Sequence, residues 1–161
     1  MNPWRRRAIT LRPAEVSDCD MLSEIHGLAF RRGWSDAEFE SLLVQPGVHA
    51  LLAHYPNRTG RQIPVGFILY RLAADEAEIL SVAVTPECRR RGVGRQLLEE
   101  ALRHIYREGA RDIHLEVEDS NLAAIALYRG VEFRESGRRT GYYKEGRETP
   151  GGALVMLRQL R

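Results

Sequence analysis

Four arginines and two glycines lie together in the middle of the chain, in a pattern that suits the binding of a polyanion. Gly92 and Gly94 allow a tight turn and a close approach of the backbone to a ligand. A helix predicted to follow would present its unpaired first-turn amides and the positive end of its dipole at the same place. We therefore predict an anion site that suits a pyrophosphate. The arginines that add charge to it are Arg89, Arg90, Arg91 and Arg95.

Two common nucleotide-binding loops do not match this stretch. A Walker loop has Lys-Ser or Lys-Thr after its second glycine, whereas Arg95 and Gln96 follow here. A dinucleotide-binding loop has a small third residue where Leu97 stands, and we find no acidic ribose-binding residue on a following strand. A glycine pair can also form a plain strand-to-helix turn with solvated arginines, and this interpretation stays open at this point.

Regular elements on both sides would hold the loop in place. Residues 79–84 are nearly all apolar and several are β-branched, which predicts a strand covered on both faces. Pro86 ends that strand. The residues after the loop predict an amphipathic helix that ends at Gly109, with Glu99 and Arg103 as a supporting pair. The apolar stripe of this helix contains Val93, Leu97, Leu98, Ala101, Leu102 and Ile105.

A second group of residues that could do chemistry follows in the next strand and helix. Residues 113–118 alternate between apolar and polar, so Glu116 lies on the polar face of a strand. The polar residues 119–121 would start a short helix, on which Asn121 and Tyr128 face the same side because they are seven residues apart. A carboxylate can remove a proton and a phenol can donate one, although a solvated glutamate and a packed tyrosine explain the same pattern.

The remaining elements complete a mixed sheet. Helices are predicted to start at the capping sequences Ser17–Asp20 and Ser35–Glu38. Residues 56–64 are predicted to form an unusually long hairpin loop, and residues 139–152 a second polar loop that carries Tyr142 and Tyr143. The order of elements predicts an α/β (α+β) fold with about seven strands and about four helices. Further strands are expected at 8–11, 49–55, 65–72, 133–138 and 153–157.

The order arginine, two residues, glycine, one residue, glycine at Arg89, Gly92 and Gly94 resembles the acetyl-CoA loop of the GNAT acetyltransferases. The order of strands and helices resembles the GNAT fold over nearly the full chain. Local similarity is greatest to the RimI-type ribosomal-protein-alanine N-acetyltransferases. Three stretches carry it, with the pair Tyr142–Tyr143 as a weaker fourth: Phe30–Phe39 with its Trp34-Ser35, Leu80–Leu98, and Leu115–Tyr128.

This resemblance implies the transfer of an acetyl group from acetyl-CoA to a primary amine, with the N-terminal alanine of a ribosomal protein as the expected acceptor. Glu116 matches the proton acceptor of the family and Tyr128 the proton donor. Asn121 matches a coenzyme contact. The residues that match the pantetheine-binding strand and the pyrophosphate loop are Val82, Ala83, Val84, Arg89, Arg90, Arg91, Gly92, Val93, Gly94 and Arg95.

Two departures from the family pattern concern the surroundings of the site. Glu132 stands where the family usually has a glycine, directly before the aromatic Phe133. The residues before Trp34 lack the usual proline, so the acceptor is less well defined than the donor. Two alternatives stay open: a GNAT enzyme that acts on another protein or a small amine, and a non-catalytic acyl-CoA-binding module.

The composition is that of an ordinary globular protein. The chain has 161 residues, 43% of them hydrophobic, and a net charge of +2, which gives no reason to expect a nucleic-acid partner or a membrane. Its five histidines and two cysteines lack metal-ligand spacing, so no metal is expected, and the few cysteines favour a reduced cytoplasm. We expect a single GNAT domain over residues 1–161, with residues 1–7 as a basic tail.

Overall fold

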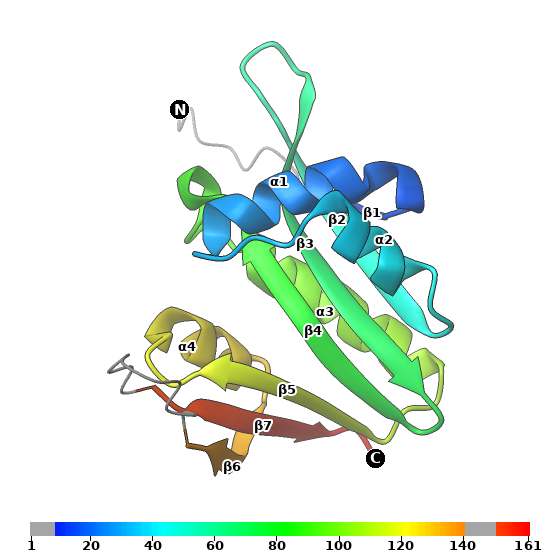
Figure 1. Cartoon of the computed structure of the whole chain (residues 1–161), viewed down its shortest axis with the longest axis vertical. Coiled ribbons are helices and arrows are strands. Elements are labelled where there is room, and N and C mark those ends of the chain that lie inside the picture. Colours follow the sequence, from blue (N-terminus) through cyan, green and yellow to red (C-terminus); the bar gives the residue numbers. More distant parts are fainter. Residues whose placement is uncertain (1–8, 141–150) are drawn as a thin grey trace, which may run out of the picture.

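The computed structural model describes residues 9–140 and 151–161, so the basic tail and the pair Tyr142–Tyr143 lie outside the described residues. Within the described part, seven strands form one sheet in the order β1-β2-β3-β4-β5-β7-β6, together with four α-helices (Figure 1). Only β4 and β5 pair in parallel among these strands, which confirms the mixed α/β sheet. The elements are β1 Thr10–Pro13, α1 Cys19–Ala29, α2 Asp36–Leu43, β2 Val48–Pro56, β3 Gln62–Ala73, β4 Glu76–Val84, α3 Val93–Arg107, β5 Asp112–Glu118, α4 Leu122–Gly130, β6 Arg134–Arg139 and β7 Ala153–Gln159.

The sheet is covered on both faces, by two separate apolar clusters. Helices α3 and α4 pack on one face, where Leu98 and Ile125 belong to the larger cluster. Helices α1 and α2 pack on the other face, where Leu22 and Phe39 are fully buried; Figure 1 shows them in front of β2 to β4. Strand β4 contributes to both clusters, which confirms that it is covered on both faces.

The sequence-based predictions were wrong for the β2–β3 loop and for one side-chain pair. The β2–β3 hairpin loop is residues 57–61 rather than 56–64, because the side-chain oxygen of Asn57 accepts hydrogen bonds from the amides of Thr59 and Arg61 and closes a tight turn. On α3, the predicted pair of Glu99 with Arg103 does not form. Arg103 binds Glu100, three residues earlier, and Glu99 binds Arg95 instead. Both observed spacings also bring side chains together on a helix.

The turn after α4 holds a glutamate in a conformation that favours glycine. Glu132 has φ +70°, in the left-handed region, where the family pattern has glycine. Its carboxylate lies 3.2 Å from Nη2 of Arg158, and Arg158 also donates to the carbonyl oxygen of Val131 at 2.8 Å. The chain therefore makes this turn without a glycine, at a backbone cost of roughly 1–2 kcal/mol for a residue with a Cβ atom.

The segment between α1 and α2 is attached to the sheet by a buried histidine. The His26 ring lies between the rings of Phe30 and Trp34, with centroid distances of 4.4 and 4.6 Å, and is 3% exposed. Its Nδ1 accepts a hydrogen bond from the Trp34 amide at 3.0 Å, so in the neutral ring Nε2 carries the proton. Burial lowers the pKa of His26, which keeps this ring neutral. Directly after Trp34, Ser35 and Glu38 form the predicted capping box of α2.

We expect Glu132→Gly to be more stable than Glu132→Ala by about 1 kcal/mol. Both variants lose the ion pair with Arg158, but only glycine relieves the left-handed backbone. Urea unfolding of the two variants and the wild type measures the difference. Equal stability of the two variants would show that the conformation of Glu132 carries no strain.

We expect His26→Phe to make the stability of the protein less dependent on pH. The folded-state pKa of His26 lies below its unfolded value of about 6.5, so the unfolded chain takes up a proton first as the pH falls. Its contribution to stability is therefore complete above about pH 6.5 and is lost as the pH falls toward the folded-state pKa. Phenylalanine keeps the ring stacking but cannot titrate. In urea unfolding between about pH 7.5 and pH 5, the wild type should lose more stability than the variant. An identical loss in both proteins would contradict this role of His26.

Candidate active site

The sheet opens between β4 and β5, halfway along the two strands. Their parallel pairing joins residues 76–79 to residues 112–115 and ends at Ile79 and Leu115. At this point Leu80 is an extra residue in β4, because Leu69 of β3 pairs with Ser81 and the next residue of β3 pairs with Ile79. Figure 1 shows the two strands diverging from here toward α4. The opening leaves the edge of β4 available to an extended ligand.

The bulge also changes which face each β4 residue occupies. Ile79 belongs to the cluster under α3, whereas Ala83 belongs to the cluster under α1 and α2. In a strand without a bulge, residues an even number of positions apart would share a face. Val82 and Val84 pack against the α3 cluster. The side chains of these residues are thus used in packing. The residues predicted to bind the pantetheine arm, Val82, Ala83 and Val84, could contact a ligand through their backbone.

The structure requires glycine at positions 92 and 94 for different reasons. Gly92 precedes α3 with φ +80°, and no protein atom lies within 4 Å of the place where its Cβ would be. Gly94 is buried, and a Cβ there would lie 3.1 Å from the side chain of Leu127 on α4. Gly92 therefore makes the turn and leaves an open approach to the α3 amides, and Gly94 lets α3 pack closely against α4. Arg90 also has a positive φ, of 62°.

Some side chains of the loop contact neighbouring residues, and others are exposed to solvent. The Arg91 guanidinium lies 5.8 Å from the centroid of the Tyr55 ring on β2. Arg95 donates to Glu99 at 2.9 Å and reaches the end of α4. Arg89 and Arg90 are exposed, and the Val93 side chain is buried, so Val93 can reach a ligand only through its backbone. The structure thus places the predicted anion loop beside both the open end of β4 and α4.

Glu116 is the first residue of β5 beyond the end of the β4–β5 pairing, so it stands at the opening. Its neighbours Leu115 and Val117 are buried in the cluster under α3 and α4, so Glu116 faces the opposite side of the sheet. Oε1 of Glu116 lies 3.0 Å from Nε of Arg139. This partner is not evident from the sequence, because residues 139–152 are predicted to be a loop and no short-range pattern links Arg139 to β5; the structure places Arg139 in β6.

Tyr128 lies on the other side of the sheet from Glu116, in the cluster under α3 and α4. It is 7% exposed, and its ring packs against Phe133 at a centroid distance of 6.0 Å. Burial raises the pKa of Tyr128 to about 12, so the phenol keeps its proton at neutral pH. This group can act as a proton donor over the whole physiological range.

Asn121 is the N-cap of α4, and its side-chain oxygen accepts a hydrogen bond from the amide of Ala124 at 3.2 Å. The coenzyme contact predicted for Asn121 would therefore use its amide nitrogen. His114 shares a strand face with Glu116, but its Nε2 lies 3.9 Å from a carboxylate oxygen of Glu76 in the paired part of β4. Asn121 thus has a structural role of its own beside the predicted one.

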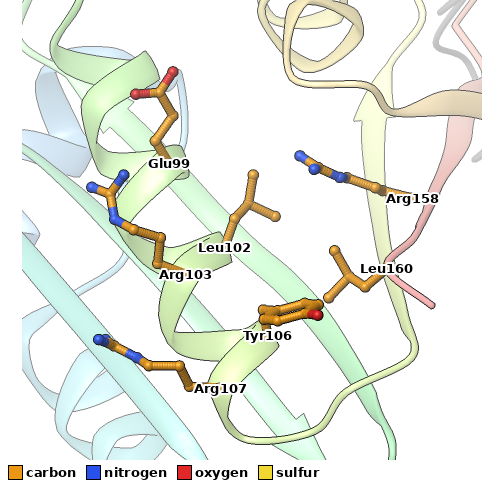
Figure 2. A pocket seen from close by; sticks show the side chains of 7 residues that line it. All are labelled: Glu99, Leu102, Arg103, Tyr106, Arg107, Arg158 and Leu160. Atoms are coloured by element: carbon orange, nitrogen blue, oxygen red, sulfur yellow. The ribbon is translucent and has the colours of Figure 1, made fainter.

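A cavity of about 400 Å³ lies between α3 and the C-terminal end of the chain (Figure 2). Apolar side chains such as Leu102, Tyr106 and Leu160 line it, and three arginines stand around it.

In the described part of the chain, no three His, Cys, Asp or Glu side chains come together as metal ligands. No helix within residues 9–140 and 151–161 is long and apolar enough to cross a membrane.

Comparison with known proteins places this geometry among acetyltransferases. Residues 19–133 match the model of the acetyltransferase (GNAT) family. The chain is 32% identical over 149 residues to the [ribosomal protein bS18]-alanine N-acetyltransferase of Escherichia coli K12, covering 91% of this chain and 95% of the relative. The crystal structure of the ribosomal-protein-S18-alanine N-acetyltransferase from Escherichia coli has a TM-score of 0.79 at 29% identity, covering 93% and 92% of the two chains. Arabidopsis thaliana NAA60, solved in complex with acetyl-CoA, shares the fold, with a TM-score of 0.79 at 20% identity over 95% and 99% of the two chains.

Proposed function

The chain belongs to the acetyltransferase (GNAT) family, and from this premise we propose that it acetylates the N-terminal α-amine of a protein, with an alanine-starting ribosomal protein as acceptor and acetyl-CoA as donor. The observation that carries the acceptor is the 32% identity, over 91% of the chain, to an enzyme named for ribosomal protein bS18. The opening between β4 and β5 supports the donor, because it joins a free strand edge to an anion loop.

In this proposal, the coenzyme lies along the open edge of β4. The backbone of residues 82–84 binds the amides of the pantetheine arm as a further strand would. The amides at the start of α3, beside Gly92, bind the pyrophosphate, and the exposed Arg89 and Arg90 offset its charge. Asn121 at the start of α4 contacts the arm from the other wall of the opening.

The reaction uses groups from both faces of the sheet. An α-amine titrates near ~8, so much of it is protonated at neutral pH and cannot attack a thioester. Glu116, directly or through a water, takes this proton on the face opposite α3. The amine nitrogen then bonds to the acetyl carbon, and the carbon–sulfur bond breaks. Tyr128, on the α3 side, gives its proton to the leaving thiolate, and its raised pKa keeps that proton available. The second proton, which the acetylated nitrogen loses, returns through water to the phenolate.

We expect a peptide with a free N-terminal alanine to be acetylated faster than the same peptide with a blocked N-terminus and an internal lysine. The lysine amine titrates near ~10.4, so a much smaller fraction is reactive at neutral pH. Release of CoA measures the rate, with peptides starting with serine or methionine and small amines as comparisons. Faster acetylation of the lysine peptide or of a small amine would contradict the proposed acceptor. Binding of acetyl-CoA without transfer to any of these would favour a non-catalytic module.

We expect Glu116→Gln to lower kcat by about 10²–10⁴-fold at neutral pH while leaving the affinity for acetyl-CoA nearly unchanged. The loss should shrink above about pH 8, where the α-amine loses its proton without help.

Tyr128→Phe keeps the ring packing against Phe133 and removes only the hydroxyl, so it should also lower kcat with little change in coenzyme binding. Steady-state kinetics and calorimetry measure both effects. Full activity of either variant would return that residue to a purely structural role.

A further inference from the structure

Glu116 is held by an arginine from a strand that β5 does not touch. Nε of Arg139, the last residue of β6, lies 3.0 Å from Oε1 of Glu116. The Arg139 side chain is 70% exposed and the Glu116 side chain 43% exposed, so the pair lies on the open face of the sheet. β7 separates the two strands. The contact therefore requires a side chain that crosses a whole strand.

The register of the three strands explains how Arg139 reaches Glu116. Across β7, Glu116 pairs with Val155, and Val155 pairs with Gly137 of β6. Two positions further, Ala153 pairs with Arg139. Residues paired across neighbouring strands share a face, so all of these lie on the same face as Glu116. The β7 residues on this face, Val155 and Ala153, have short side chains, over which the longer arginine side chain extends to Glu116.

The backbone of Arg139 is tied to the end of β5 by Gly152. The Gly152 amide donates to the carboxylate of Asp119 at 3.2 Å, and the Asp119 amide donates to the carbonyl oxygen of Gly152 at 3.0 Å. A Cβ on Gly152 would lie 2.5 Å from the carbonyl oxygen of Arg139, so only glycine allows this approach. The starting point of the arginine is thus fixed relative to the strand that carries Glu116.

From this geometry we propose that Arg139 is a positioning residue for Glu116, an inference that rests on the proposed function of Glu116 as the base. Nε of Arg139 contacts Oε1, and in this proposal Oε2 faces the acceptor amine. A glutamate without this partner would sample several side-chain rotamers at the opening, and proton transfer depends on its geometry. Because exposed ion pairs contribute little to folding, the loss of this pair should affect the rate and leave stability nearly unchanged.

Arg138 offers a matched control one residue away on the same strand. Its Nε lies 2.8 Å from Oε1 of Glu135, and its side chain is 63% exposed. It pairs with Leu154 of β7, which is buried in the cluster under α3, so it lies on the other side of the strand from Arg139. Arg138→Gln therefore removes one arginine and one exposed ion pair from β6 without touching Glu116.

A double-mutant cycle tests the inference, using the full chain, acetyl-CoA and a peptide with N-terminal alanine. We expect Arg139→Gln to lower kcat by about tenfold, with the acetyl-CoA Kd and the Tm close to the wild type. In the Glu116→Gln background the same change should have no further effect, because Arg139 acts through the carboxylate. Arg138→Gln should keep the wild-type kcat.

Three results would overturn the inference alone, in a protein whose wild type is active and whose Glu116→Gln variant is slow. These are a wild-type kcat in Arg139→Gln, equal losses from Arg139→Gln in both backgrounds, and an equal loss in Arg138→Gln. An inactive wild type, or full activity of Glu116→Gln, would instead overturn the proposed function and this inference with it. The wild-type and Glu116→Gln rates thus separate the two failures.

Discussion

The end of the β4–β5 ladder at Ile79 and Leu115 is the constraint on which the rest of the site depends. The strands can part there because each keeps another partner: β4 remains paired with β3 as far as Val84, and β5 remains paired with β7 along its whole length. The unpaired backbone groups at the opening need hydrogen-bond partners, which water or a ligand supplies. The fold thus leaves an unpaired strand edge inside a sheet while each strand keeps a paired neighbour.

Close packing around the opening then fixes what surrounds it. Gly94 lets the start of α3 approach Leu127 of α4, and Gly66 of β3 lies so close to Ala83 that a Cβ there would be 2.9 Å from its carbonyl oxygen. These two contacts bring the anion loop, the free end of β4 and α4 together. Glu116 and Tyr128 lie on opposite faces of the sheet, the glutamate exposed and the tyrosine buried, so the sheet itself keeps the two groups apart.

Most elements were predictable from the sequence because their signals are local. The loop at Arg89–Gly94, the capping box Ser35–Glu38 and the alternation of β5 each involve residues within one short segment. The bulge at Leu80 was not predictable, since a continuous apolar run looks the same with or without an extra residue. The contact of Arg139 with Glu116 was hidden for another reason. It depends on β7 lying between β5 and β6, and the sequence order of the strands does not specify this. The chemical roles of the site residues stay predictions.

The ion pair also bears on a difficulty that any carboxylate base for an ammonium substrate faces. An isolated carboxylate attracts the protonated amine and favours the form that cannot attack. A guanidinium on one of the two oxygens shares this charge, so the pair as a whole attracts an ammonium ion less than a bare carboxylate does. The free oxygen can still accept a proton by a directed hydrogen bond. In the proposed reaction, the pair with Arg139 thus weakens the attraction that would hold the amine in its charged form.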